Sequence, residues 1–288
     1  MKEAVFKGCA SALITPFTHD SVDYDAFKRL IDFQLSAGIN ALVVCATTGE
    51  ASTMSYAERM RTIETAVNHV AGKVPVIAGT GANSTETAIA LSRDAERIGA
   101  DALLIVTPYY NKATQRGLVL HYEMKPVMLY NVPSRTGVSC TAGTYAALSA
   151  HPNIVGVKEA SGNLSLVQKT RELCPDDFYI WSGNDDETAP IMLLGGIGVI
   201  SVVSNVAPQE MITLTQACLD GDFQKAGKQQ IHLRRLCDIL FREVNPIPVK
   251  TAMSMMGYCQ NILRLPLCEM SKENRKELEQ VLRFYSLL

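Results

Sequence analysis

Short apolar runs recur along the chain and alternate with longer amphipathic stretches. Eight runs of six or seven residues are present, at 10–15, 41–46, 74–79, 101–107, 126–131, 153–159, 177–182 and 198–203. Short apolar runs bounded by turn residues are typical of buried strands. Segments between them, such as 23–37 and 84–98, place their apolar side chains on one helical face. The alternation predicts βαβ units and a parallel sheet.

The spacing of the runs predicts a closed barrel. After the first run, successive starts are 21 to 33 residues apart, which leaves room for one helix and two turns. Eight such units predict an α/β protein with a (β/α)8 TIM barrel. A doubly wound open sheet is the alternative, but no GxGxxG follows the first strand.

Beyond Pro208 the pattern is only helical. The predicted helices are 211–219, 223–241, 248–256 and 272–287. We expect a barrel domain at 1–222 and a helical C-terminal domain at 223–288. The short helices of that extension cannot bury themselves alone, so they should pack on the barrel or on another subunit.

Polar residues gather at the C-terminal ends of the predicted strands. These ends are TPF, TTGE, GTGAN, TPYYN, YNVPSR, KEASG, SGNDD and SNVAP. Active sites of TIM barrels lie on this face, although some of these residues also cap helices. Capping does not account for Lys158, Tyr130 or Arg135.

Lys158 is the residue around which we build the functional hypothesis. It ends a run of apolar residues that begins after Pro152. Its ammonium could extend from the strand end into water. Alternatively, burial could lower the pKa of the amine until it attacks a carbonyl carbon and forms a Schiff base.

Neighbouring strand ends carry groups that such chemistry needs. Thr47 and Thr48 belong to a Thr-Thr-Gly turn, whose hydroxyl and N–H groups suit a carboxylate, although the turn could be only a helix cap. The phenol of Tyr130 could carry a proton, or it could simply pack in the barrel. Tyr110 offers a second hydroxyl, and Arg135 offers a fork for a second carboxylate.

Two further patterns resemble functional motifs. Lys250, in NPIPVK, follows a Pro-x-Pro element and not a strand, so we interpret it as structural. Asp185-Asp186-Glu187 resembles a metal cluster, but acidic residues at a helix start also complement the helix dipole. We predict no catalytic metal.

Composition narrows the class of protein. Hydrophobic residues make up 47% of the 288 residues, charged residues 19%, and the net charge is -2, which argues against a nucleic-acid partner. No two of the eight cysteines form a CxxC, so we expect reduced thiols. We find neither a signal peptide nor a membrane span, and we expect a cytoplasmic protein.

Taken together, these residues resemble the dihydrodipicolinate synthase (4-hydroxy-tetrahydrodipicolinate synthase) branch of the pyruvate-dependent Schiff-base lyases. The similarity runs from Gly8 to Leu267. The matching motifs are TTGE, AGTGAN, TPYYN, YNVPSRTG, GVKEASGN, GVISVVSN and NPIPVK.

The resemblance implies a class I aldolase-like lyase of diaminopimelate and lysine biosynthesis. Pyruvate would become an enamine on Lys158 and attack L-aspartate 4-semialdehyde, without an organic cofactor. The site residues that it implies are Lys158, Thr47, Tyr110 and Tyr130 for catalysis, Thr48 for the pyruvate carboxylate, Arg135 for the second carboxylate, and the main chain of Gly183 and Ile200. It also implies a homotetramer, a dimer of dimers, in which Tyr110 reaches the neighbouring subunit.

Two alternative functions stay open. N-acetylneuraminate lyase and the 2-keto-3-deoxy-sugar-acid aldolases share the lysine and the tyrosine, but Ser134-Arg135-Thr136 favours an amino-acid aldehyde. A binding or regulatory barrel without activity is a second alternative, against which the retention of Lys158, Tyr130 and Thr47 argues.

The chain departs from the family pattern in two places. The crossover at 109–125 has 17 residues, about ten fewer than relatives and near the minimum for such a connection. Either its helix is truncated or residues near Met124 and Lys125 are missing from the sequence, and we favour the second.

The other departure concerns regulation by L-lysine. Asn83 and Tyr109 match the family's allosteric site, whereas Ala51, Tyr56 and Thr87 replace residues often seen in sensitive members. Thr87 stands where a glutamate commonly receives the lysine amino groups. We expect a weak response to L-lysine.

Overall fold

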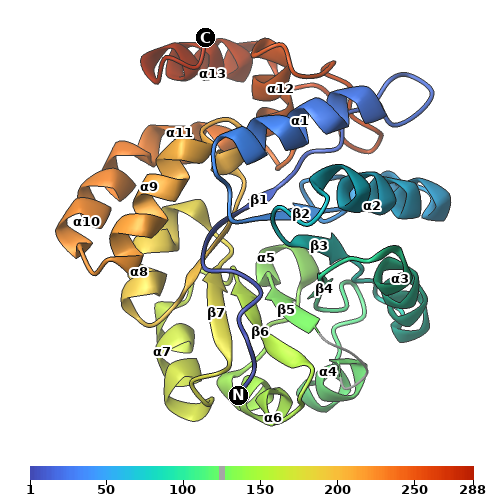
Figure 1. Ribbon diagram of the computed structural model, residues 1–288, viewed down its shortest axis with the longest axis vertical. Helices are drawn as coiled ribbons and strands as arrows, with labels where there is room; N and C mark the ends of the chain where they lie inside the picture. Colours follow the sequence, from blue (N-terminus) through green and yellow to red (C-terminus); the bar gives the residue numbers. More distant parts are fainter. Residues whose placement is uncertain (123–126) are drawn as a thin grey trace.

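The chain folds into a closed parallel barrel with helices around it (Figure 1). The computed structural model describes residues 1–122 and 127–288. The strands are β1 (Gly8–Ala12), β2 (Ala41–Val44), β3 (Val76–Gly79), β4 (Ala102–Val106), β5 (Val127–Asn131), β6 (Ile154–Glu159), β7 (Tyr179–Ser182) and β8 (Gly198–Ser201). They follow chain order around the barrel, and β1 pairs with β8. The predicted (β/α)8 fold is confirmed.

Helices alternate with the strands as predicted. The helices of the barrel are α1 (Tyr24–Ser36), α2 (Tyr56–Val70), α3 (Thr85–Ile98), α4 (Gln115–Tyr122), α5 (Pro133–Thr136), α6 (Ala142–Ser149), α7 (Leu164–Leu173), α8 (Thr188–Leu193) and α9 (Pro208–Leu219). Short 3-10 turns are η1 (Ala51–Thr53), η2 (Asp185–Glu187) and η3 (Val203–Asn205). Side chains fix several helix starts, because Asp23 and Ser84 accept hydrogen bonds from N–H groups of the first turn. Ser55 and Glu58 form a capping box at α2.

Two layers of apolar side chains hold the barrel together. Strand alternation points one set into the barrel, including Ile77, Leu104, Met128 and Trp181. The opposite set packs against the surrounding helices. Because both faces of each strand are covered, the strands appear in the sequence as continuous apolar runs.

The C-terminal extension forms helices α10 (Phe223–His232), α11 (Arg234–Leu240), α12 (Ile247–Met255) and α13 (Lys272–Phe284). The prediction of one helix over 223–241 is wrong, because the chain turns at Leu233 and starts a second helix. Helices α11 to α13 lie together beside α1 at one end of the molecule (Figure 1). Helices α11 and α12 contact η3, and α11 also contacts η2, so the extension packs against turns that follow β7 and β8. The proposed domain boundary at 222/223 stays a prediction.

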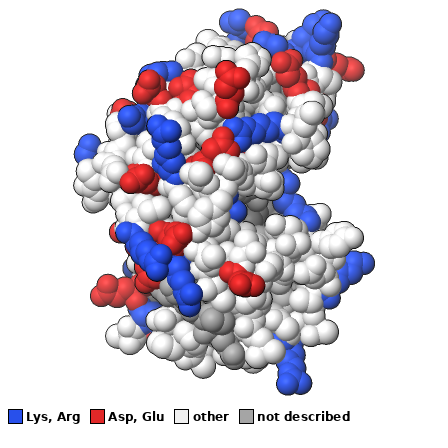
Figure 2. Space-filling model, turned by 90° about the vertical axis from the view of Figure 1, so that its right-hand side faces the viewer, with Lys and Arg blue, Asp and Glu red and all other residues white. Residues whose placement is uncertain are grey.

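Charged side chains of both signs are interspersed over the described face drawn in Figure 2, which is hollowed at mid-height. Within residues 1–122 and 127–288, no helix is long and apolar enough to cross a membrane. The predicted departure near Met124 and Lys125 lies outside the described residues.

Candidate active site

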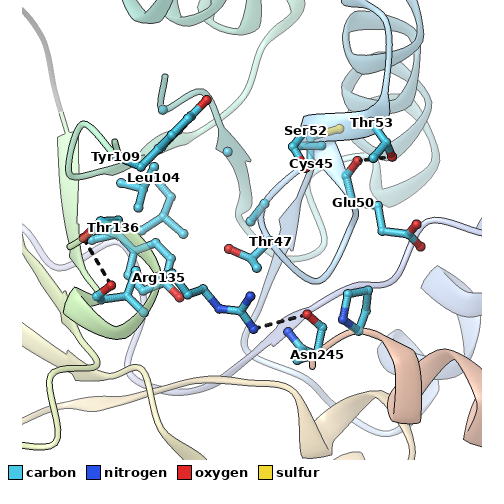
Figure 3. Close-up of a pocket in the computed structure, with 18 of the residues that line it drawn as sticks. Cys45, Thr47, Glu50, Ser52, Thr53, Leu104, Tyr109, Arg135, Thr136 and Asn245 are labelled. Carbon is cyan, nitrogen blue, oxygen red and sulfur yellow. Dashed lines mark hydrogen bonds between the residues drawn. The ribbon is translucent and has the colours of Figure 1, made fainter. Parts of the chain in front are cut away.

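A cavity of about 310 Å³ opens at the C-terminal ends of the strands (Figure 3). Its lining includes Thr47 after β2, Tyr130 on β5, Arg135 on α5 and Asn245 just before α12. Residues far apart in the sequence therefore meet on the barrel face where the polar strand ends predicted a site.

Lys158 is buried at the end of β6, with a relative exposure of 5%. It pairs in the sheet with Tyr130, and its Nζ lies 4.4 Å from the centroid of that ring. Since neighbouring strand residues face opposite sides, Glu159 instead accepts a hydrogen bond from Tyr145 among the helices. Among the described residues, Lys158 Nζ makes neither a hydrogen bond nor an ion pair, and its burial contradicts a side chain that extends into water.

The surroundings of Lys158 favour a neutral amine. Burial lowers its pKa to about 8, and the positive charge of Arg135 acts in the same direction. The Asp185 carboxylate opposes that shift. An amine with this pKa is partly unprotonated near neutral pH, as an attacking nucleophile must be.

Tyr130 links Lys158 to the turn after β2. Its side chain is 7% exposed, and burial raises its pKa. The charge of Arg135 and a hydrogen bond with Thr47 counteract that rise. A phenol held between a hydroxyl and an amine is placed to pass a proton between them.

Thr47 lines the cavity, and hydrogen bonds hold the Thr47-Thr48-Gly49 turn to which it belongs. The hydroxyl of Thr48 accepts a hydrogen bond of 3.1 Å from Asn245 Nδ2. The Gly49 carbonyl accepts one of 2.8 Å from the Thr15 hydroxyl at the end of β1. The turn is thus a fixed group of N–H and hydroxyl donors suited to a small carboxylate.

Arg135 lies on the opposite wall of the cavity and points toward Asn245 (Figure 3). Its guanidinium donates a hydrogen bond of 3.2 Å to the Asn245 carbonyl. The remaining N–H groups of the guanidinium are suited to donate two parallel hydrogen bonds to a second anionic group.

Gly183 and Ile200 lie on neighbouring strand ends. A Cβ at Gly183 would come within 2.6 Å of the Ala160 side chain, so the close approach of β6 and β7 requires glycine there. Ile200 is fully buried on β8, inside the barrel with Tyr130.

Two functional candidates escaped the sequence analysis. Asp185, predicted only to complement a helix dipole, is buried and acts on the pKa of Lys158. Its Oδ2 accepts hydrogen bonds from the N–H groups of Val202 and Val203, while Oδ1 has no partner in the part of the chain that the structure describes. Asn245 starts the NPIPVK motif, but only the fold shows that it lines the cavity.

Three predicted residues lie toward the edge of this arrangement. Tyr110 is 88% exposed and does not line the cavity. Tyr109 is half-exposed at the rim, and the Asn83 carbonyl accepts a hydrogen bond from Asn111 nearby. Within one chain, Tyr110 is thus not brought together with Lys158.

Known proteins share both this sequence and this structure. Residues 5–284 match the model of the dihydrodipicolinate synthetase family. The chain belongs to that family. A 4-hydroxy-tetrahydrodipicolinate synthase of Alkaliphilus oremlandii is 50% identical over 95% of this chain and 97% of its own.

Solved structures of family members agree with the fold. Dihydrodipicolinate synthase from Aquifex aeolicus superposes with a TM-score of 0.96 at 45% identity, over 98% of this chain and 99% of its own. The chloride-inhibited enzyme from Acinetobacter baumannii, complexed with pyruvate, gives 0.95 at 39% identity, over 98% and 99%. The family resemblance drawn from the motifs is confirmed, and with it the lyase class.

Proposed function

We propose that this chain condenses pyruvate with L-aspartate 4-semialdehyde as a 4-hydroxy-tetrahydrodipicolinate synthase, in diaminopimelate and lysine biosynthesis. One observation carries the proposal: the Lys158 amine is buried without a hydrogen-bonded partner among the described residues and lies over the ring of Tyr130, which lines the cavity together with Thr47. Relatives that bear this name cover nearly the whole chain.

The first step is imine formation. The Thr47-Thr48-Gly49 turn binds the pyruvate carboxylate, and the neutral amine of Lys158 attacks the ketone carbon. Water leaves as the C–N double bond forms, with Tyr130 and Thr47 moving the protons. The protonated imine draws electrons from the methyl group, which loses a proton and becomes the nucleophilic carbon of an enamine. Lys158 is the electron sink, so the chemistry needs no organic cofactor.

The second step joins the two substrates. Arg135 binds the carboxylate of the semialdehyde and directs its aldehyde carbon toward the enamine. A carbon–carbon bond forms, and the aldehyde oxygen takes up a proton. The amino group of the new chain then attacks the imine carbon, closes the ring and releases Lys158. The main chain of Gly183 and Ile200 lines this space.

The assembly and the location of the enzyme belong to the same proposal. Tyr110 is exposed on a single chain, where it is free to enter the site of a neighbouring subunit as a third relay hydroxyl. We therefore propose a homotetramer built as a dimer of dimers. We also place the enzyme in the cytoplasm, where pyruvate is available.

A coupled assay tests the function. Purified enzyme is offered pyruvate with L-aspartate 4-semialdehyde, and in parallel pyruvate with N-acetylmannosamine. We expect turnover only with the semialdehyde. Turnover only with N-acetylmannosamine would assign a sugar-acid aldolase. If neither mixture gives turnover and borohydride traps no pyruvate adduct, the protein is a barrel without this activity.

A further inference from the structure

A second buried lysine, Lys250, lies behind the carboxylate-binding turn. Lys250 belongs to α12, and its side chain and that of Glu50, which follows Gly49, are both 0% exposed. The ammonium donates hydrogen bonds to Glu50 Oε1 and, at 3.0 Å, to the Ile262 carbonyl. It also lies 4.1 Å from the centroid of the Phe17 ring. The ion pair with Lys250 anchors Glu50 to the C-terminal extension.

Glu50 belongs to the cavity lining, but its side chain turns away from the cavity (Figure 3). Its second carboxylate oxygen accepts a hydrogen bond of 3.2 Å from the Arg264 N–H. Glu50 has a φ of 53°, in the left-handed region that residues other than glycine seldom occupy. A backbone in this conformation persists where its surroundings hold it, and here the held group is the Glu50 carboxylate.

The C-terminal extension contacts the same turn at a second position. Asn245, five residues before Lys250, binds the Thr48 hydroxyl through Nδ2 and accepts a hydrogen bond from Arg135 at its carbonyl. One segment of the extension therefore contacts the residues assigned to the carboxylates of both substrates. Buried ion pairs are often no more stabilising than apolar side chains of similar volume, so the value of this pair lies in the geometry that it fixes.

We propose that Lys250, acting through Glu50, is a positioning residue that holds the Thr47-Thr48-Gly49 turn in the geometry that binds pyruvate. The inference rests on the proposed function. It gives the C-terminal extension a direct part in substrate affinity, in addition to its packing on the barrel.

The test separates pyruvate binding from stability. Two variants are compared. Lys250→Met leaves the Glu50 carboxylate buried without its partner. The double variant Glu50→Gln/Lys250→Met removes both charges and keeps an acceptor for the Arg264 N–H. Tyr285→Phe is the matched control, because it removes a hydrogen bond within the extension, between Tyr285 and the His232 carbonyl, away from the turn. Thermal unfolding is measured for every variant.

The readout is borohydride trapping of the pyruvate imine over a range of pyruvate concentrations. In the double variant we expect the half-saturating concentration to rise roughly ten- to hundredfold, as for the loss of one charge-assisted hydrogen bond. The KM for the semialdehyde, at saturating pyruvate, should stay within about twofold. Tyr285→Phe should leave both values unchanged.

An unchanged half-saturation in a folded double variant would overturn the proposal. So would an equal rise for both substrates, or a rise of the same size in Tyr285→Phe, since these indicate general loosening. If wild-type enzyme forms no trappable adduct, the proposed function itself fails, and that outcome is distinct from the others.

Discussion

Two buried lysines, Lys158 in the barrel and Lys250 in the C-terminal extension, have different surroundings. Lys250 is enclosed with a carboxylate and a carbonyl oxygen, which satisfy its ammonium. Lys158 is almost as buried, but within the described residues its Nζ has no hydrogen-bonded or ion-paired partner and lies over the face of the Tyr130 ring. Burial alone therefore does not define a reactive lysine. The difference lies in whether the charged form is compensated, since an uncompensated amine favours the neutral, nucleophilic state.

Exchanging each lysine for alanine should give the largest contrast. Lys158→Ala should abolish imine formation while the fold stays intact, because Lys158 is the one lysine of the described residues whose amine lies over the Tyr130 ring. Borohydride trapping and thermal unfolding measure the two effects. A pyruvate adduct that persists in Lys158→Ala would break the comparison.

Lys250→Ala should affect stability first. It leaves the Glu50 carboxylate buried without its partner, which costs about 3–5 kcal/mol of unfolding free energy. Chemical denaturation of the wild type, Lys250→Ala and Lys158→Ala measures this. A loss in Lys158→Ala as large as that in Lys250→Ala would show that compensation does not distinguish the two lysines.

Arg135→Ala tests whether Arg135 affects the use of the semialdehyde more than the formation of the pyruvate imine. In the proposed function the guanidinium binds the second carboxylate, so we expect kcat/KM for the semialdehyde to fall roughly ten- to hundredfold. Because Arg135 also lowers the pKa of Lys158, its removal should raise that pKa, while the pyruvate imine still forms at alkaline pH. Equal losses in both half-reactions at alkaline pH would contradict this assignment.

The pH dependence of imine formation tests the state of Lys158. Below a pKa of about 8 the amine is mostly protonated, so the rate should rise about tenfold per pH unit and level off above it. Asp185→Asn removes the carboxylate that favours the charged form, so the profile should move to lower pH. A profile that moves to higher pH, or does not move, would exclude this role of Asp185.

Free L-lysine gives the smallest expected effect. The ammonium group of the free amino acid needs a carboxylate partner, as the ammonium of Lys250 needs Glu50. The side chain of Thr87 supplies no carboxylate. The nearby Tyr56 hydroxyl already donates to Asp94. Titration of L-lysine against the initial rate should show no half-inhibition below about 1 mM, which corresponds to ~4 kcal/mol of binding. Half-inhibition at lower concentrations would refute the expectation.

The barrel could be predicted from the sequence because its signals are local. All eight strands overlap the predicted runs, since strands covered on both faces are continuously apolar. The first prediction was displaced, however. The strand begins at Gly8, which already pairs with Gly198 of β8, and the run at 10–15 gives no sign of that pairing.

Residues of the candidate site could be predicted from the sequence only where they lie at or just after the end of a predicted strand. Lys158, Tyr130, Thr47 and Arg135 could be assigned to one face because parallel strands end there together. Lys250 was interpreted as structural because it follows a Pro-x-Pro element and not a strand. Its contact with Glu50 could not be predicted, since it spans 200 residues of sequence. Such contacts depend on how the extension docks, which no local pattern encodes.

The most direct test of the account is to map the pyruvate adduct. Wild-type enzyme is treated with pyruvate and borohydride near pH 8, digested, and analysed by mass spectrometry. We expect a single modified lysine, Lys158, with Lys250 unmodified in the same digest. An adduct on Lys250, or on several lysines to a similar extent, would contradict it.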